Sequence, residues 1–347
     1  MPTRRIHHVG TLGGPEYAPA AAIAAEVTGQ YCVTFPTDEP EGWVIEPIRA
    51  LGQRPEVLTL IKSRFHQNPM RVWHGAVYTA RPGKRITPDT LGLDYTQRVA
   101  RSVPVLHDLA HAAGYYWRPQ VDIPGPLDFA ALSFGPLVPR YYRTTVEATS
   151  LQVNAIESTG IKPVYQLSVP VEVFLIASAP AALQQTVVEL LAARLVSFIT
   201  STTPGTEWIL HPCNGDPHGR PLKDPLAHKP ANPRLLKAAV LLVNAVWKAW
   251  PAGYRLNAVH LPMGDGTHPA PADPRYYVAL RLLDVHGVHV SAGLANLNAP
   301  LHNQQVALAE AERAARRALG VSTPCGLGRR PHAAQLLLQR MVELAQL

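Results

Sequence analysis

The stretch Glu207-Trp208-Ile209-Leu210-His211-Pro212-Cys213 decides the fold class. Its apolar residues have the length and composition of a buried strand, and it lies between two long helical patterns, Pro180 to Thr200 and Pro233 to Ala249. Both helical patterns begin with proline, which is common in the first turn of a helix. A strand with a helix on either side is the unit from which parallel sheets are built.

The same alternation extends over the whole chain. The other expected strands are Ile6 to Leu12, Tyr31 to Phe35, Met70 to Thr79, Tyr115 to Val121, Val164 to Val171, Arg255 to Leu261, Val288 to Gly293 and Gly320 to Thr323. The other expected helices are Tyr17 to Val27, Tyr95 to Ala113, Asn303 to Leu319 and Pro331 to Leu347. We therefore predict an α/β fold, a single (β/α)8 TIM barrel over residues 1–347, with long loops on its catalytic face. The strand candidates exceed the eight of a barrel by one, so one candidate is expected to be extra.

Composition excludes several classes of protein. No stretch approaches the roughly eighteen uninterrupted apolar residues that a membrane helix needs. The start, Met1 to His8, leads into an expected strand without an apolar leader, so we expect no secretion. An odd, small number of cysteines, three, favours thiols or metal ligands in a reducing compartment. A soluble cytoplasmic protein without a membrane partner is predicted.

The formal net charge of +7 is a property that nucleic-acid-binding proteins often have. The basic residues are scattered, and the densest groups are Arg313, Arg316 and Arg317 in one expected helix and Arg329-Arg330 beyond it. No nucleic-acid-binding module surrounds them, so we expect no nucleic-acid partner. An anionic small substrate, or basic residues on solvated helix faces, accounts for the charge instead.

Histidine and cysteine at two strand ends predict a zinc site. His211 and Cys213 can place an imidazole nitrogen and a thiolate on one ion, and Cys325, in a turn that continues with glycine, supplies a third ligand. Ligands on separate strand ends favour a catalytic metal centre over a zinc finger, whose paired ligands bracket a short loop. The alternative is a buried apolar cysteine and two unrelated surface residues. Cys32, early in an expected strand, is interpreted as a small core residue.

In a parallel barrel, the C-terminal ends of all strands lie on one face. Residues far apart in the sequence therefore meet there, and the expected strand ends carry polar side chains. These ends include Gly10-Thr11, Asp38-Glu39, Asp122, Ser168, His211 to Asp216, His260 and Cys325-Gly326. The proline-rich stretches 212–233 and 261–274 follow two of these strands and are expected to be ordered loops of the site.

At these positions the chain resembles the catalytic domain of cobalamin-independent methionine synthase and its relatives in the uroporphyrinogen decarboxylase/methionine synthase-like superfamily. The motifs that carry the resemblance are Gln166-Leu167-Ser168-Val169-Pro170, His211-Pro212-Cys213, Asn257-Ala258-Val259-His260, Gly320 to Leu327 and, more weakly, Val9-Gly10-Thr11. The resemblance implies that His211, Cys213 and Cys325 bind zinc. By position, Gly10, Thr11 and Ser168 are expected to bind substrate.

The chain departs from the family at one implied ligand. The family has a carboxylate at the end of the intervening strand, where this chain has His260. Two thiolates and two neutral imidazoles on Zn²⁺ give a neutral centre, which is a stronger Lewis acid than a centre with one carboxylate. The alternative is that His260 is a packed strand histidine that hydrogen-bonds to the backbone.

Four further residues are candidates for proton transfer. Asp216 and His218 follow the His-x-Cys pair and either orient a ligand imidazole or act as acid and base, or Asp216 only caps a turn. Asp38 and Glu39 follow the second strand and either contact substrate or share a proton, or they are exposed loop carboxylates. His7 is interpreted as a surface or strand histidine.

Three functions remain open. The first is a zinc-dependent alkyl or methyl transferase that activates a small thiol, with one barrel instead of the duplicated barrels of full-length methionine synthases. The second is a lyase or hydrolase that uses zinc as a Lewis acid. The third is a barrel that binds a ligand without turnover.

Overall fold

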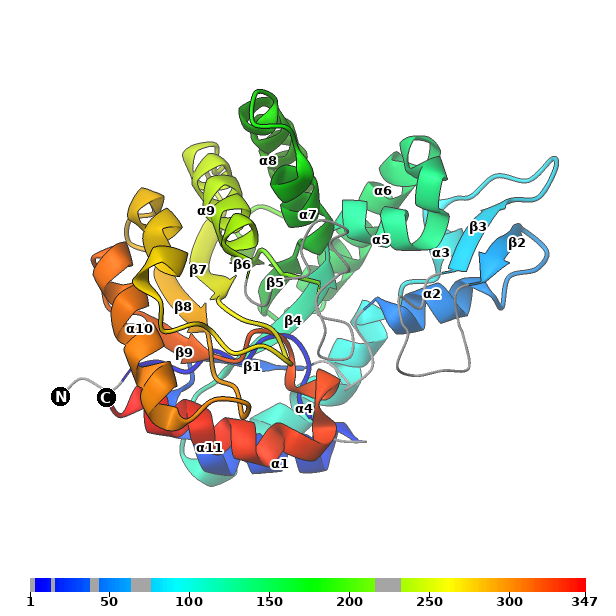
Figure 1. Cartoon of the computed structure of the whole chain (residues 1–347). Helices are drawn as coiled ribbons and strands as arrows, with labels where there is room; N and C mark the ends of the chain where they lie inside the picture. Colours follow the sequence, from blue (N-terminus) through cyan, green and yellow to red (C-terminus); the bar gives the residue numbers. More distant parts are fainter. Residues whose placement is uncertain (1–3, 14–15, 38–43, 64–75, 216–231) are drawn as a thin grey trace.

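A curled sheet of seven parallel strands forms the centre of the computed structural model, which describes residues 4–13, 16–37, 44–63, 76–215 and 232–347. The strand order is β1-β4-β5-β6-β7-β8-β9 (Figure 1). The strands are β1 Thr34–Pro36, β4 Arg118–Pro124, β5 Val164–Ser168, β6 Glu207–His211, β7 Arg255–Pro262, β8 His289–Gly293 and β9 Gly320–Ser322. The predicted α/β class and its parallel sheet are confirmed.

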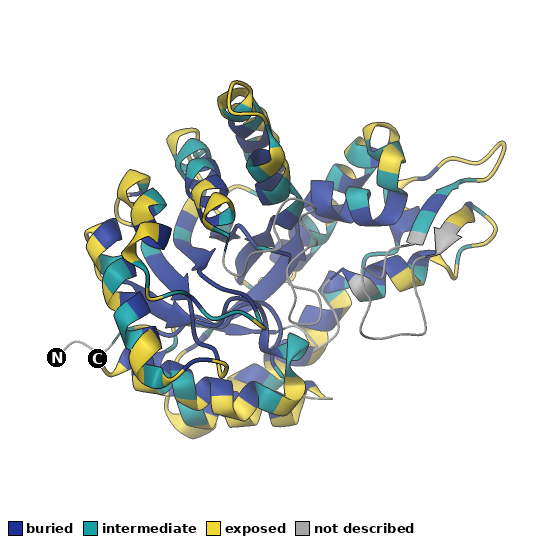
Figure 2. Cartoon of the chain, in the orientation of Figure 1, coloured by how far each residue is buried: buried dark blue, intermediate teal, exposed yellow. Residues whose placement is uncertain are grey.

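Helices cover the outside of the sheet (Figure 1). The longer ones are α1 Tyr17–Thr28, α4 Tyr95–Ala113, α6 Val138–Ser158, α8 Gln184–Thr200, α9 Pro233–Lys248, α10 Leu301–Ala315 and α11 Ala334–Ala345, and the shorter ones α5 Pro126–Phe134 and α7 Pro170–Ser178. Figure 2 shows buried strands and helices with one buried and one exposed side, as expected for amphipathic helices on a sheet. In the part of the chain that the structure describes, no helix is both long and apolar enough to cross a membrane.

The sheet does not close into the predicted barrel. The expected first strand, Ile6 to Leu12, contributes only an isolated parallel bridge between Ile6 and Val321 of β9. On the side facing away from β9, the backbone N–H of Ile6 donates to Tyr31 O at 3.1 Å, and this one hydrogen bond is not a strand pairing. Gly10 has a positive φ of 56°, so the segment is no longer extended at that residue. The closed (β/α)8 barrel is therefore corrected to a curled, open parallel sheet.

The extra strand candidate belongs to a separate hairpin. β2, Leu58–Ser63, and β3, Ala76–Ala80, pair antiparallel and form a two-stranded sheet beside the main one (Figure 1). The helices α2, Ile45–Leu51, and α3, Pro88–Leu91, lie in the same part of the chain. A second core cluster, which includes Ile48, Leu58, Tyr78, Leu91 and Phe134, packs the hairpin against α5 and α6. A single domain over residues 1–347 stays a prediction.

The two faces of the main sheet differ in chemistry. The outward residues of β5 and β6 are apolar, and Trp208 packs its ring against Tyr165 at a centroid distance of 5.3 Å. On the inward face, Val164, Ile209 and Ala258 form a small apolar cluster. Beyond that cluster, towards the C-terminal strand ends, the inward positions are polar. The helices therefore hold the sheet from outside, and the inside is left for a site.

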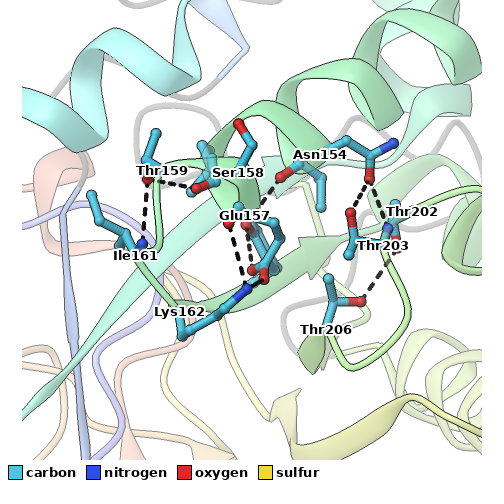
Figure 3. Close-up of polar contacts among 12 residues, drawn as sticks. Asn154, Glu157, Ser158, Thr159, Ile161, Lys162, Thr202, Thr203 and Thr206 are labelled. Atoms are coloured by element: carbon cyan, nitrogen blue, oxygen red, sulfur yellow. Dashed lines mark hydrogen bonds and ion pairs between the residues drawn. The ribbon is translucent and has the colours of Figure 1, made fainter.

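The opposite end of the sheet is tied together by structural hydrogen bonds (Figure 3). Asn154 Oδ1 accepts from the backbone N–H of Thr203 at 2.7 Å and from its hydroxyl at 2.9 Å. Glu157 accepts from Lys162 Nζ at 2.7 Å. These contacts link the end of α6 to the turns before β5 and β6, so they stabilise the N-terminal end of the sheet.

A buried pair of carboxyl groups joins α5 to α7. Asp128 accepts from the backbone N–H of Val171 at 2.7 Å, and its second oxygen and Glu172 Oε2 have no hydrogen-bond donor among the described residues. Burial raises the pKa of Asp128 well above its usual value, and the neighbouring Glu172 raises it further. Burial also raises the pKa of Glu172 to about 7. The pair therefore retains a shared proton at neutral pH and links the two helices.

This pair predicts a pH-dependent stability. Because the folded pKa of Glu172 lies above its ordinary value of 4.5, the stabilisation is complete below about pH 4.5 and is lost as pH rises through about 7. The side chain of Glu172→Gln cannot ionise. Between about pH 5 and 8, the free energy of unfolding of this variant should therefore fall less than that of the wild type, with a difference of roughly 3 kcal/mol. Chemical denaturation across this range measures the difference.

Glu189→Gln, which changes an exposed carboxyl on α8, is the matched control and should follow the wild type. Parallel pH curves for wild type and Glu172→Gln would show that Glu172 does not titrate in this range.

Candidate metal and substrate site

The sheet brings the predicted site residues to its C-terminal end. His211 is the last residue of β6, and Cys213 follows it by two positions. Cys325 lies in the turn after β9, and its neighbour Gly326 packs so closely that an added Cβ would lie 2.9 Å from Val9 O. Parallel pairing thus places segments from the start, middle and end of the chain side by side.

The two cysteine thiols are buried and free of disulfides. Cys213 Sγ accepts the backbone N–H of Gly215 at 3.3 Å. The neighbouring Cys213 thiol and, after it, His211 hold the pKa of the Cys325 thiol well below its usual value, against the opposing effect of burial. The thiolate, which is the form that binds soft metals and attacks electrophiles, is therefore easier to form at Cys325 than at an isolated buried thiol.

A β-bulge sets the partner of His211. The ladder between β6 and β7 shifts by one residue, and Asn257 is the extra residue on β7. Its amide donates to Glu207 Oε2 at 2.6 Å, which holds the bulge in place. Beyond the bulge, the shifted pairing continues to the end of β6, so His260, and not Val259, lies beside His211. Because side chains alternate along a strand, both imidazoles lie on the same face of the sheet.

Both ring nitrogens of His260 contact protein atoms. Its Nδ1 lies 2.6 Å from His211 Nδ1, and its Nε2 lies 3.1 Å from the carbonyl oxygen of Thr323. Two imidazole nitrogens on one tetrahedral zinc ion would be about 3.3 Å apart, given Zn–N bonds of ~2.0 Å. The shorter distance between the rings is that of a hydrogen bond, so as it stands His260 contacts His211 and the backbone.

His211 Nε2 is a buried polar atom of the site and has no hydrogen-bond partner among the described residues. Across those residues, no group of three or more histidine, cysteine, aspartate or glutamate side chains could hold a metal ion as it stands. An unpartnered imidazole nitrogen and two neighbouring thiols nevertheless form the donor set that zinc prefers. The side chains fit zinc in chemistry, and they would need to draw together to bind it.

A buried polar network lies on the neighbouring strands β4 and β5. Ser168 donates its hydroxyl to Asp122 Oδ1 at 2.6 Å, and Gln166 Oε1 lies 3.0 Å from His7 Nε2. Burial raises the pKa of Asp122 to about 6, and the hydrogen bond from Ser168 opposes the rise. Position 10 has room only for glycine, because a Cβ there would lie 2.6 Å from Asp122 Oδ2. A carboxyl group with a pKa near neutrality thus lies beside the first segment of the chain.

The structure places the other predicted site residues as follows. Gly10, Thr11 and Ser168 lie at this end of the sheet, and Thr11 O accepts the backbone N–H of Gly328 at 3.2 Å. Asp38, Glu39, Asp216 and His218 lie outside the described residues, so their roles stay predictions. His7, interpreted as a surface or strand histidine, is buried in the network.

Sequence reasoning missed Gln166 as a polar contact and the pair Asp265 and His268. Gln166 alternates with Ser168 on an otherwise apolar strand, a pattern that signals a polar inward face. In the loop after β7, His268 Nδ1 lies 2.9 Å from Asp265 Oδ2, and Asn214 Nδ2 donates to Gly264 O at 3.3 Å. The amide contact joins this loop to the segment that carries Cys213.

Comparison with known proteins identifies the fold. No family model and no curated protein matches the chain. Among solved structures, a methyltransferase from Methanosarcina mazei matches with a TM-score of 0.53 and 12% identity over 99% of this chain and 94% of that one. A B12-independent methionine synthase from Shewanella sp. W3-18-1, solved in complex with selenomethionine, matches with a TM-score of 0.50 and 12% identity over 99% of this chain and 97% of that one. The expected likeness in fold to a methionine synthase is thus confirmed, and the chain shares the fold of both structures.

Proposed function

We propose that this protein is a methyl or alkyl transferase that uses zinc, held by His211, Cys213 and Cys325, to activate a small thiol. The observation that carries the proposal is the buried, unpartnered His211 Nε2 beside two thiols at the C-terminal end of the sheet. The fold shared with a methyltransferase and a methionine synthase supports the same class of reaction. When bound, zinc holds a substrate thiol as the thiolate at neutral pH.

The chain's own residues provide the surroundings for that reaction. The buried Asp122 carboxyl, oriented by the Ser168 hydroxyl, suits a cationic or hydrogen-bond-donating group of the substrate. The close approach of the Gly10 backbone confines such a group to one side of the carboxyl. Thr11 and Gly326 lie in the same packed corner. These residues would orient the substrate and keep water away from its thiol.

The first test of the proposal is metal content. Protein purified without chelator should contain about one zinc ion per chain, and Cys213→Ser or Cys325→Ser should lose most of it, since each removes a thiolate donor. Elemental analysis measures the zinc. Circular dichroism should show that both variants stay folded, because a large core does not depend on a catalytic metal.

Cys32→Ser is the matched control, because Cys32 Sγ contacts Thr28 O at 3.4 Å, outside the set of proposed ligands. This variant should retain its zinc. Full zinc retention in both Cys213→Ser and Cys325→Ser would refute the proposed ligands.

The second test asks whether the site takes a thiol. Binding of homocysteine or 2-mercaptoethanol to the zinc-loaded protein near pH 7 should release about one proton per thiol, because the bound form is the thiolate. Calorimetry in buffers of different ionisation enthalpy measures this proton. Homoserine and ethylene glycol, which carry hydroxyls in place of the thiols, should release none.

The second candidate function is a lyase or hydrolase that uses zinc as a Lewis acid. A donor set of two thiolates and neutral imidazole favours this second candidate. A zinc centre with that set is less negative than a zinc centre that also has a carboxylate ligand. Zinc-dependent turnover that needs no thiol, together with no proton release on thiol binding, would favour this candidate over the transferase.

A further inference from the structure

His260 is held in one orientation by atoms on three elements. The Thr323 carbonyl faces its Nε2 at 3.1 Å, and His211 Nδ1 faces its Nδ1 at 2.6 Å. Gly293 on β8 leaves room for the ring, since an added Cβ there would lie 2.6 Å from His260 Nε2. The ring is fully buried, so it cannot turn to face solvent. Its contacts therefore fix which atoms carry protons.

The proton positions follow from the types of the partner atoms. A carbonyl oxygen only accepts, so His260 Nε2 must carry a hydrogen and donate it to Thr323 O. A neutral His260 then presents a bare Nδ1, which can only accept. The single hydrogen between the two rings must belong to His211 Nδ1. A neutral His211 with a hydrogen on Nδ1 has its lone pair on Nε2, the buried atom without a hydrogen-bond partner.

We infer that His260 is a positioning residue that fixes the tautomer of His211 and aims its Nε2 lone pair at the two thiols, and that His260 is not itself a metal ligand. The inference rests on the proposed function only in taking the recipient of that lone pair to be zinc. Histidine ligands commonly donate their second N–H to a neighbouring acceptor, which fixes the ring and raises its basicity. Here the acceptor is a second imidazole in place of a carboxylate or carbonyl.

The opposite arrangement would make His260 the donor to His211. His260 would then carry hydrogens on both nitrogens and a positive charge in a fully buried position. Its described hydrogen-bond contacts are an imidazole and a backbone carbonyl, neither of which is an anion that could pair with a buried imidazolium. The charged form is therefore disfavoured, and the arrangement with a neutral His260 is retained.

The role of His260 determines how many zinc positions the protein fills. If His260 is not a ligand, the protein supplies three donors, one imidazole and two thiolates. Zinc in catalytic sites commonly takes three protein ligands and leaves the fourth position for water or substrate. The fourth position would then be available to a substrate thiol without displacing a protein ligand.

The decisive experiment determines the tautomers in the metal-free wild-type protein. Long-range nitrogen–proton correlation spectra of protein with labelled histidine rings show which nitrogen carries the hydrogen. We expect His211 protonated on Nδ1 and His260 protonated on Nε2, with the two signals assigned from His211→Asn and His260→Asn variants. A hydrogen on His211 Nε2, whether in place of the one on Nδ1 or in addition to it, would overturn the inference.

Metal affinity supplies the second readout. His260→Asn keeps a carbonyl oxygen that can accept from His211 Nδ1 but removes the imidazole as a ligand, so its zinc affinity should stay close to that of the wild type. His260→Ala removes the acceptor and should weaken zinc binding about 10 to 100-fold. Competition with a chromophoric chelator measures both affinities, and circular dichroism checks that the variants fold. His289→Asn, at the start of β8, is the matched control and should bind like the wild type.

Equal losses in His260→Asn and His260→Ala, with a changed visible spectrum of the Co²⁺-substituted Asn variant, would show that His260 is a ligand and overturn the inference. A wild-type protein that binds no zinc but has the expected tautomers would refute the proposed function and leave the positioning role intact. The two failures are therefore distinguishable.

Discussion

The one-residue bulge at Asn257 is the constraint on which the site depends. Without the extra residue, β7 would continue in its initial register, and Val259 would lie beside His211. The side-chain amide of Asn257 donates a hydrogen bond to Glu207 Oε2 and so stabilises the bulge. Glu207 Oε2 also accepts from Arg118 Nη1 at 2.7 Å. A polar cluster at the N-terminal end of the sheet thus determines which side chain meets His211 at the other end.

The inside of the curled sheet contains many polar side chains but few charged ones. Burial holds the pKa of His7 at about 3 and that of His260 well below its usual value, so both rings are neutral. Neutral groups in a buried site must satisfy one another by hydrogen bonds, and Gln166 and Thr323 O provide acceptors. Among the described residues of the site, Asp122 and the Cys325 thiol can carry negative charge near neutral pH. A cation or an electrophile suits such surroundings better than an anion.

Much of the fold could be predicted from the sequence, because periodicity is a local signal. The expected strand Glu207 to His211 and the expected helix Tyr95 to Ala113 match β6 and α4. The convergence of His211, Cys213 and Cys325 at one end follows from parallel pairing. The openness of the sheet and the contact between His260 and His211 could not be predicted, since each depends on the register of paired strands. A bulge is a property of two strands together, and the sequence of β7 alone does not reveal it.

The measurement that tests the central claim most directly is X-ray absorption at the zinc edge of the metal-loaded protein. The account predicts two sulfur ligands at about 2.3 Å and one imidazole nitrogen at about 2.0 Å, with a fourth, light ligand from water. On addition of a small thiol, a third sulfur should replace that light ligand. A coordination shell with two imidazoles, or with fewer than two sulfur atoms, would contradict the account.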